Sequence, residues 1–169
     1  MRSAADRGWL FPLAAAVILV GDLLTKAAVE ATLDHGRIVP VLGEWFQFRL
    51  VYNQGAAFGL YMGPFSRWIF LAIGLAAMVL LWRMARGTPG TDRFRHMALG
   101  LVAGGAAGNV VDRIRSSNGV VDFLDVGVGA LRWPTFNLAD IGVTCGAVAL
   151  AVSLWMEDAR RTRAERSAA

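Results

Sequence analysis

The sequence predicts a mainly α-helical membrane protein, with four transmembrane helices and a small β-sheet cradle on the outer side of the membrane. The chain has 169 residues, of which 56% are hydrophobic and 18% are charged. Soluble domains have roughly 45–50% apolar and about 25% charged residues. Four apolar stretches, with their flanks, approach the roughly 20 residues that a membrane span requires. After the first of them, aromatic residues alternate with other side chains, which is typical of a strand.

The four predicted helices cover residues 9–31, 66–86, 96–113 and 136–157. Asp22, Lys26 and Glu30 interrupt the first apolar stretch, and the second and third contain shorter uncharged runs. The first stretch follows two arginines, as in a secretory signal peptide, but no clear small-residue cleavage site comes after it. We therefore expect a retained first helix and one integral membrane domain over residues 1–169.

Glycines at a spacing of four residues predict close packing of the third and fourth helices. Small residues at this spacing let helix backbones approach each other. The glycines concerned are Gly100, Gly104 and Gly108 in the third helix, and Gly142 and Gly146 in the fourth. We expect this packing to bring Asn109 and Arg113 near Asp140.

The distribution of basic residues predicts the orientation in the membrane. The net charge is +4, and the 17 basic residues are 16 arginines and one lysine, Lys26. Ten of them flank the predicted helices on one side, at positions 2–7, 83–95 and 160–166. Because cytoplasmic flanks carry the excess of Lys and Arg, both termini are expected in the cytoplasm. Arginines placed between apolar segments favour a membrane surface over nucleic acid as the partner.

Two segments are predicted on the outer side. Residues 36–63 form the β-rich segment, where Phe46, Phe48, Leu50 and Tyr52 recur at every second position. Aromatic residues of this kind suit the membrane–water boundary. The residues from Asn53 to Gly55 read as a turn, in which glycine permits close backbone approach to a ligand. Residues 114–135 are expected to form an outer loop.

Two aspartates occur where a carboxylate is costly. Asp122 lies in an apolar run just before the fourth helix, and Asp140 lies in the first turns of that helix. Ionisable groups in such places are usually functional. Two carboxylates that share a site do not both ionise easily, so one keeps a proton while the other acts as a base. The sequence thus predicts a shared acid/base site that activates water. The alternative is two unrelated aspartates that cap helices or pair with arginines.

Further polar residues gather at the predicted outer helix ends. Asn137 is three residues from Asp140, hence on one helix face, and Asn109 precedes Asp112 and Arg113 by three and four residues. An asparagine can orient a carboxylate or donate to a developing oxyanion. Arg113 either holds an anionic group or neutralises Asp112.

Asp22 and Lys26 are one helical turn apart in the first helix. They can neutralise each other within the membrane, either as a purely structural pair or as support for a site. A Ser/Lys protease would need a serine beside Lys26, and Ser66 is the candidate in space. The single cysteine, Cys145, is expected to be a buried packing residue.

Other functional classes are less well supported. A small transporter or proton relay would spread ionisable groups through the membrane depth, whereas Asp112, Asp122 and Asp140 gather on one side. A helical scaffold without chemistry would leave the converging polar groups unexplained. His35 and His96 fall on opposite predicted sides, so no metal or other cofactor is expected.

Five segments in order along the chain resemble the lipoprotein signal peptidases, or type II signal peptidases. They are Asp22-x-x-Thr25-Lys26, Asn53-x-Gly55-Ala56-Ala57-Phe58, Gly108-Asn109-x-x-Asp112-Arg113, Val120-Val121-Asp122-Phe123 and Phe136-Asn137-x-Ala139-Asp140. The match covers nearly the whole chain. Two positions depart from the family pattern: Leu23 replaces a common glutamine, and Ile141 replaces a small residue, often serine.

The resemblance implies an aspartic endopeptidase of the bacterial inner membrane, active as a monomer near the periplasmic face. It would cut diacylglyceryl-modified prolipoproteins just before the lipidated cysteine, and it would bind membrane lipid and globomycin-type inhibitors but no nucleic acid. Asp122 and Asp140 would be the catalytic dyad, and Asp22 and Lys26 would support it. The residues implied to line the site are Asn53, Gly55, Asn109, Arg113, Asn137 and Ala139.

Overall fold

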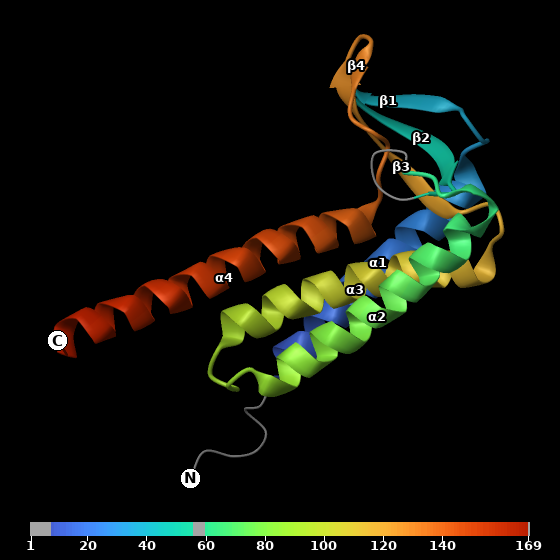
Figure 1. Ribbon diagram of the computed structural model, residues 1–169. Helices are drawn as coiled ribbons and strands as arrows, with labels where there is room; N and C mark the ends of the chain where they lie inside the picture. Colours follow the sequence, from blue (N-terminus) through green and yellow to red (C-terminus); the bar gives the residue numbers. More distant parts are fainter. Residues whose placement is uncertain (1–7, 56–59, 169) are drawn as a thin grey trace.

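Four helices and one antiparallel sheet make up the computed structural model, which describes residues 8–55 and 60–168 (Figure 1). The helices are α1 (Leu10–Thr32), α2 (Ser66–Gly87), α3 (Arg93–Arg115) and α4 (Leu138–Ala168), and a short 3-10 helix, Gly63–Phe65, precedes α2. The strands are β1 (Ile38–Leu42), β2 (Phe46–Asn53), β3 (Val120–Val128) and β4 (Leu131–Arg132). Figure 1 shows the sheet at one end of the helices, as the sequence predicts.

Helix α3 is the centre of the bundle. It packs against α1, α2 and α4, while α1, α2 and α4 are each long and apolar enough to cross a membrane. Because its neighbours cover it, α3 can contain polar and small residues that a lipid-facing helix would exclude. Its 23 residues correspond to about 35 Å of helix, enough to cross a hydrocarbon core of about 30 Å. The predicted four-helix arrangement is thus confirmed.

Glycines allow α3 to approach both α1 and α4, but their partners differ from the prediction. A methyl group on Gly104 would lie 2.9 Å from Cα of Ala15, so this glycine faces α1. Gly105, one residue further on, faces the Ala139 carbonyl of α4. On α4, a methyl group on Gly146 would lie 2.7 Å from the Val102 side chain. Close packing is confirmed, and the glycine row that includes Gly104 serves mainly the α1 contact.

The sheet joins the two outer segments of the chain. Its strand order is β1-β2-β3-β4, and β2 pairs with β3 through Val51 opposite Asp122 and Asn53 opposite Val120. The predicted strand pattern before Asn53 is confirmed by β2. The predicted loop at residues 114–135 is wrong, because it contains β3 and β4. The first residues of β3 are buried on both faces, so they form a continuous apolar run without the alternation that identifies a strand.

Two further expectations differ from the structure. Helix α4 continues to Ala168 rather than ending near residue 157, since its polar, arginine-rich end keeps residues with good helix propensity. Figure 1 shows this end projecting beyond the other helices. Cys145 is exposed rather than buried, because it borders an open cavity.

The glycine contact between α1 and α3 yields a first expected outcome. Gly104→Ala should reduce the free energy of unfolding by about 1–3 kcal/mol, because the added methyl group has no room against the α1 backbone. Thermal unfolding in detergent micelles measures this effect. Gly87→Ala is the matched control, since no heavy atom lies within 4 Å of its added methyl group. Equal melting temperatures for the two variants would contradict the packing account.

Candidate active site

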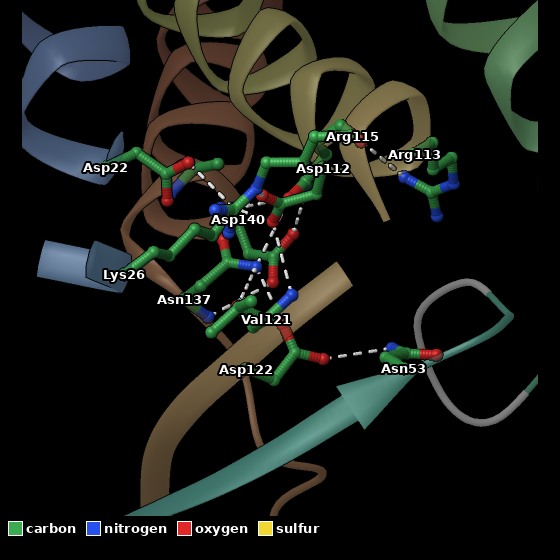
Figure 2. Close-up of polar contacts among 12 residues, drawn as sticks. Asp22, Lys26, Asn53, Asp112, Arg113, Arg115, Val121, Asp122, Asn137 and Asp140 are labelled. Atoms are coloured by element: carbon green, nitrogen blue, oxygen red, sulfur yellow. Dashed lines mark hydrogen bonds and ion pairs between the residues drawn. The ribbon is translucent and has the colours of Figure 1, made fainter. Parts of the chain in front are cut away.

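The polar residues predicted to share a site meet where the sheet joins the helix bundle (Figure 2). Asp122 comes from β3 and is 2% exposed, and Asp140 lies in the first turn of α4. Asp122 was expected just before a helix, but it lies within the strand that precedes the α4 connection. The antiparallel bridge between Leu124 and Phe136 returns the chain toward Asp122 before α4 begins. This return brings the two aspartates into one site.

Asn137 connects the two aspartates. Its side-chain nitrogen donates to Oδ1 of Asp122 at 2.7 Å, and its backbone nitrogen donates to Oδ2 of Asp140 at 3.2 Å. The backbone nitrogen of Asp140 donates in return to Oδ1 of Asn137 at 2.9 Å. This reciprocal pair is a capping box, in which side chains satisfy the free amides at a helix N-terminus. The start of α4 therefore fixes the Asp140 carboxylate and also orients the amide that binds Asp122.

Two more asparagines complete the hydrogen bonding of these carboxylates. Asn53, at the end of β2, donates to Oδ2 of Asp122 at 3.0 Å. Asn109, on α3, donates to Oδ1 of Asp140 at 2.9 Å. Each carboxylate oxygen thus accepts one hydrogen bond from an amide nitrogen, which leaves further lone pairs for a water molecule or substrate. Three parts of the chain supply the donors: the end of β2, α3 and the start of α4.

Burial gives Asp122 an unusual proton affinity. Burial, together with the nearby charge of Asp140, raises the pKa of the Asp122 carboxyl from 3.8 to about 7, although the hydrogen bonds from Asn53 and Asn137 act in the opposite direction. Desolvation and a like charge both disfavour the ionised form. Near neutral pH Asp122 therefore exchanges between its protonated and ionised forms.

Both carboxylates face a cavity of about 640 Å³ with an apolar wall. The wall comes from α2, α3 and α4 and includes Phe70, Ile73, Val110 and Val143. Cys145 also lines this cavity, which accounts for its exposure. A cavity with a few convergent polar groups and mostly apolar lining is the usual form of a ligand site.

Arg113 lines one end of the cavity. It does not neutralise Asp112, which was one of its two predicted roles. Its guanidinium donates to the Gly55 carbonyl at 2.8 Å and to the Asn109 carbonyl at 3.1 Å, and it lies over the Phe70 ring at 5.5 Å. Asp112 pairs with Lys26 and Arg115 instead. Arg113 thus links the end of β2 to α3, with its charge near both aspartates.

The predicted pair of Asp22 and Lys26 is confirmed at 2.7 Å, with both side chains fully buried. The Ala139 amide donates to Asp22 at 2.9 Å, which places the pair directly behind the first turn of α4. The ammonium of Lys26 is bound by Asp22, Asp112 and Asn109, while the Ser66 hydroxyl accepts from the Met62 amide. Lys26 is therefore not placed as the base of a Ser/Lys protease.

The structure brings together all ten predicted site residues, and it adds others. Phe70, Arg115 and the apolar residues of the cavity wall were missed, because an apolar residue in a membrane helix has no local sign that it lines a site. The Ala56-Ala57-Phe58 part of the predicted motif lies outside the described residues. Across residues 8–55 and 60–168, no three His, Cys, Asp or Glu side chains form a group that could hold a metal ion.

Comparison with known proteins decides the family. The family model described as signal peptidase (SPase) II matches residues 14–156. This chain belongs to the signal peptidase II family. It is 40% identical over 152 residues to a lipoprotein signal peptidase of Burkholderia mallei (strain SAVP1), which covers 89% of this chain and 87% of that protein. It is 41% identical over 154 residues to a lipoprotein signal peptidase of Paraburkholderia phymatum, covering 90% and 89% of the two chains.

Solved structures show the same fold. A bacterial membrane enzyme solved by the in meso method at 2.3 Å resolution superposes with a TM-score of 0.79 and 26% identity, covering 88% of each chain. A second, at 1.9 Å resolution, has a TM-score of 0.74 and 27% identity, covering 84% of this chain and 90% of the other. This signal peptidase II family member is therefore a peptidase and a multi-pass membrane protein.

The interaction between the two aspartates yields a second expected outcome. Asp140→Asn should lower the pKa of Asp122 below about 7, because it removes a nearby negative charge that disfavours ionisation. Infrared titration of the protonated carboxyl band measures this change. Asp125→Asn is the control, since Asp125 is buried on the same strand but forms an ion pair with Arg132 at 2.7 Å. An Asp122 pKa that stays the same or rises in Asp140→Asn would contradict the shared site.

Proposed function

We propose that this protein is an aspartic endopeptidase that removes signal peptides from diacylglyceryl-modified prolipoproteins, cutting just before the lipidated cysteine. The observation that carries the proposal is the pair of carboxylates, Asp122 and Asp140, held by amide donors at an apolar cavity. Membership of the signal peptidase II family supports the substrate class. The alternative of a transporter or proton relay has no such support.

The unequal environments of the two aspartates suggest their roles. Asp122 acts in its protonated form, because burial and the nearby charge of Asp140 raise its pKa to about 7. Asp140, which is less buried, acts as the base and takes a proton from a water molecule. The resulting hydroxide forms a bond to the carbonyl carbon of the scissile peptide, while Asp122 gives its proton to the carbonyl oxygen. The pair titrates as a unit, so each proton movement affects both carboxyl groups.

Collapse of the tetrahedral intermediate completes the reaction. The carbon–nitrogen bond breaks, and the proton that Asp140 took from water passes to the leaving amine. Asp122 recovers its proton as the new carboxyl group forms. The two carboxylates keep their relative positions during these transfers through hydrogen bonds from Asn53, Asn109 and Asn137. No covalent intermediate with the enzyme is needed.

The cavity suits a substrate that remains partly in the membrane. Its apolar wall would contact the lipid part of the substrate, while Arg113, which is bound to the Gly55 carbonyl, lies at its polar end and the Ala139 amide anchors the start of α4 to Asp22. The acyl chains would stay in the bilayer while the peptide reaches the dyad. A globomycin-type cyclic peptide would occupy the same cavity. We place the protein in the bacterial inner membrane as a monomer, with cytoplasmic termini and the site near the periplasmic face, because the basic flanks favour that orientation.

Replacement of either carboxylate tests the function directly. Asp122→Asn and Asp140→Asn should each lower kcat by about 100-fold or more, because general acid or base catalysis is lost. Gel-shift cleavage of a diacylated precursor by purified protein measures the rate. Asp125→Asn is the matched control, since it neutralises another buried aspartate of β3 outside the cavity. Wild-type cleavage by Asp140→Asn would refute the assignment.

The pH dependence follows from the proton held by Asp122. The rate should fall as the pH rises through about 7, because the ionised form of Asp122 cannot protonate the substrate carbonyl. Initial rates of precursor cleavage from pH 5 to pH 9 measure the profile. A rate that keeps rising above pH 8 would contradict this role.

The folded fraction must be measured at each pH as a control for that experiment. Because the pKa of Asp122 in the folded protein lies above its ordinary value of 3.8, folding binds a proton. The stability contributed by this group is complete below pH 4 and is lost as the pH rises through about 7. The decline in rate per folded molecule is the quantity that bears on catalysis.

A further inference from the structure

Three fully buried charged side chains lie next to the proposed dyad and take no part in the chemistry above. The Lys26 ammonium lies 2.7 Å from Oδ2 of Asp22 and 2.8 Å from Oδ2 of Asp112. Arg115 binds the other oxygen of Asp112 at 2.9 Å and also Glu30 at 2.9 Å, so two cations are shared among three carboxylates. Removing such charges from water is costly. These costly side chains nevertheless lie beside the proposed dyad rather than elsewhere in the bundle.

Each of these two aspartates binds the residue that directly precedes a member of the dyad. The Ala139 amide, just before Asp140, donates to Oδ1 of Asp22 at 2.9 Å. The Val121 amide, just before Asp122, donates to Oδ2 of Asp112 at 3.2 Å. The two contacts join different elements, since one runs from α4 to α1 and the other from β3 to α3. Asp22 and Asp112 therefore each accept a hydrogen bond from the backbone amide of the residue before one dyad aspartate.

Lys26 also acts on Asp140 through a third contact. Its ammonium donates to Oδ1 of Asn109 at 3.1 Å, and the side-chain nitrogen of Asn109 donates to Asp140 at 2.9 Å. Because an ammonium is only a donor, it fixes the Asn109 amide with its oxygen toward Lys26. The nitrogen of that amide is then left to face Asp140. Figure 2 shows Lys26 and Asp22 on one side of Asp140 and Asn53 on the other.

We propose that Lys26, Asp22 and Asp112 are positioning residues that set the separation and orientation of the two dyad carboxylates. Charge-assisted hydrogen bonds are strong and geometrically defined, so each carboxylate anchors the backbone beside one catalytic aspartate. Lys26 binds the carboxylates of both Asp22 and Asp112 and so keeps these two anchors together. An ion cluster that only joined α1 to α3 would need no contact with β3 or α4. The proposal rests on the proposed function, because it assigns these residues to the same reaction.

Replacement of the central cation is the first test. Lys26→Met should lower kcat by about 100-fold, because small displacements of catalytic groups have effects of this size. KM should change little, since the cavity wall is intact. The pH profile should also shift, because the distance between the carboxylates sets how strongly they influence each other's ionisation. Rates are measured per folded molecule, with diacylated precursor.

Arg95→Met is the matched control. Arg95 lies at the other end of α3 and binds Glu157 of α4 at 2.6 Å, so the variant also removes a cation from an interhelical ion pair. It should lower the melting temperature while leaving kcat and the pH profile unchanged. Normal kcat and an unshifted pH profile in folded Lys26→Met would overturn the positioning role.

A charge-balanced variant keeps the test decisive if Lys26→Met does not fold. Asp22→Asn combined with Lys26→Met removes one negative and one positive charge, and Asp112 keeps its partner Arg115. The amide oxygen of residue 22 still accepts a hydrogen bond, but the link between the two anchors is lost. This variant should fold and show the same reduced kcat and shifted pH profile. Wild-type values would overturn the positioning role.

The same experiments separate this inference from the proposed function. If Asp122→Asn and Asp140→Asn retain wild-type cleavage, the proposed function itself fails. If those variants are inactive while the Lys26 variants have normal kcat and pH profiles, only the positioning role fails.

Discussion

Charge burial inside an apolar bundle is the constraint on which the rest of this structure depends. Lys26, Asp22 and Asp112 have no exposed side-chain surface, so each needs its partners in place before the helices can close. Removing one partner of a buried ion pair costs about 3–5 kcal/mol, because it leaves a charge without compensation. The requirement fixes α1 against α3, and through Ala139 and Val121 it also fixes α4 and β3. The end of the bundle that carries the sheet is consequently a rigid frame.

The proposed dyad uses that frame in two different environments. Asp122 is buried on a strand, whereas Asp140 is partly exposed at the start of a helix whose capping box holds it. Two like residues are thereby placed in different surroundings, which is how the members of a catalytic carboxylate pair come to have separate roles. The adjoining cavity combines this polar end with an apolar wall from three helices. Polar groups suited to acid–base chemistry and an apolar surface are thus brought together at one cavity.

Much of this arrangement could be predicted from the sequence. Apolar length and composition predict the helices, the alternation before Asn53 predicts β2, and the cost of a carboxylate in apolar surroundings singles out Asp122 and Asp140. β3 could not be predicted in this way, because its first residues are buried on both faces and lack alternation. The ion pair between Asp112 and Lys26 could not be predicted from the spacing of residues either, since the two side chains come from different helices that are far apart in the sequence. Local periodicity reports one element at a time, whereas these contacts depend on how elements pack.

In the proposed mechanism, Asp122 and Asp140 act as one unit on a single water molecule. A double-mutant cycle on kcat tests it most directly, with Asp122→Asn, Asp140→Asn and the double variant assayed on the same diacylated precursor. Residues that act as a unit have strongly non-additive effects, so the double variant should be about as slow as either single variant. Losses that multiply, as expected for independent groups, would contradict the account.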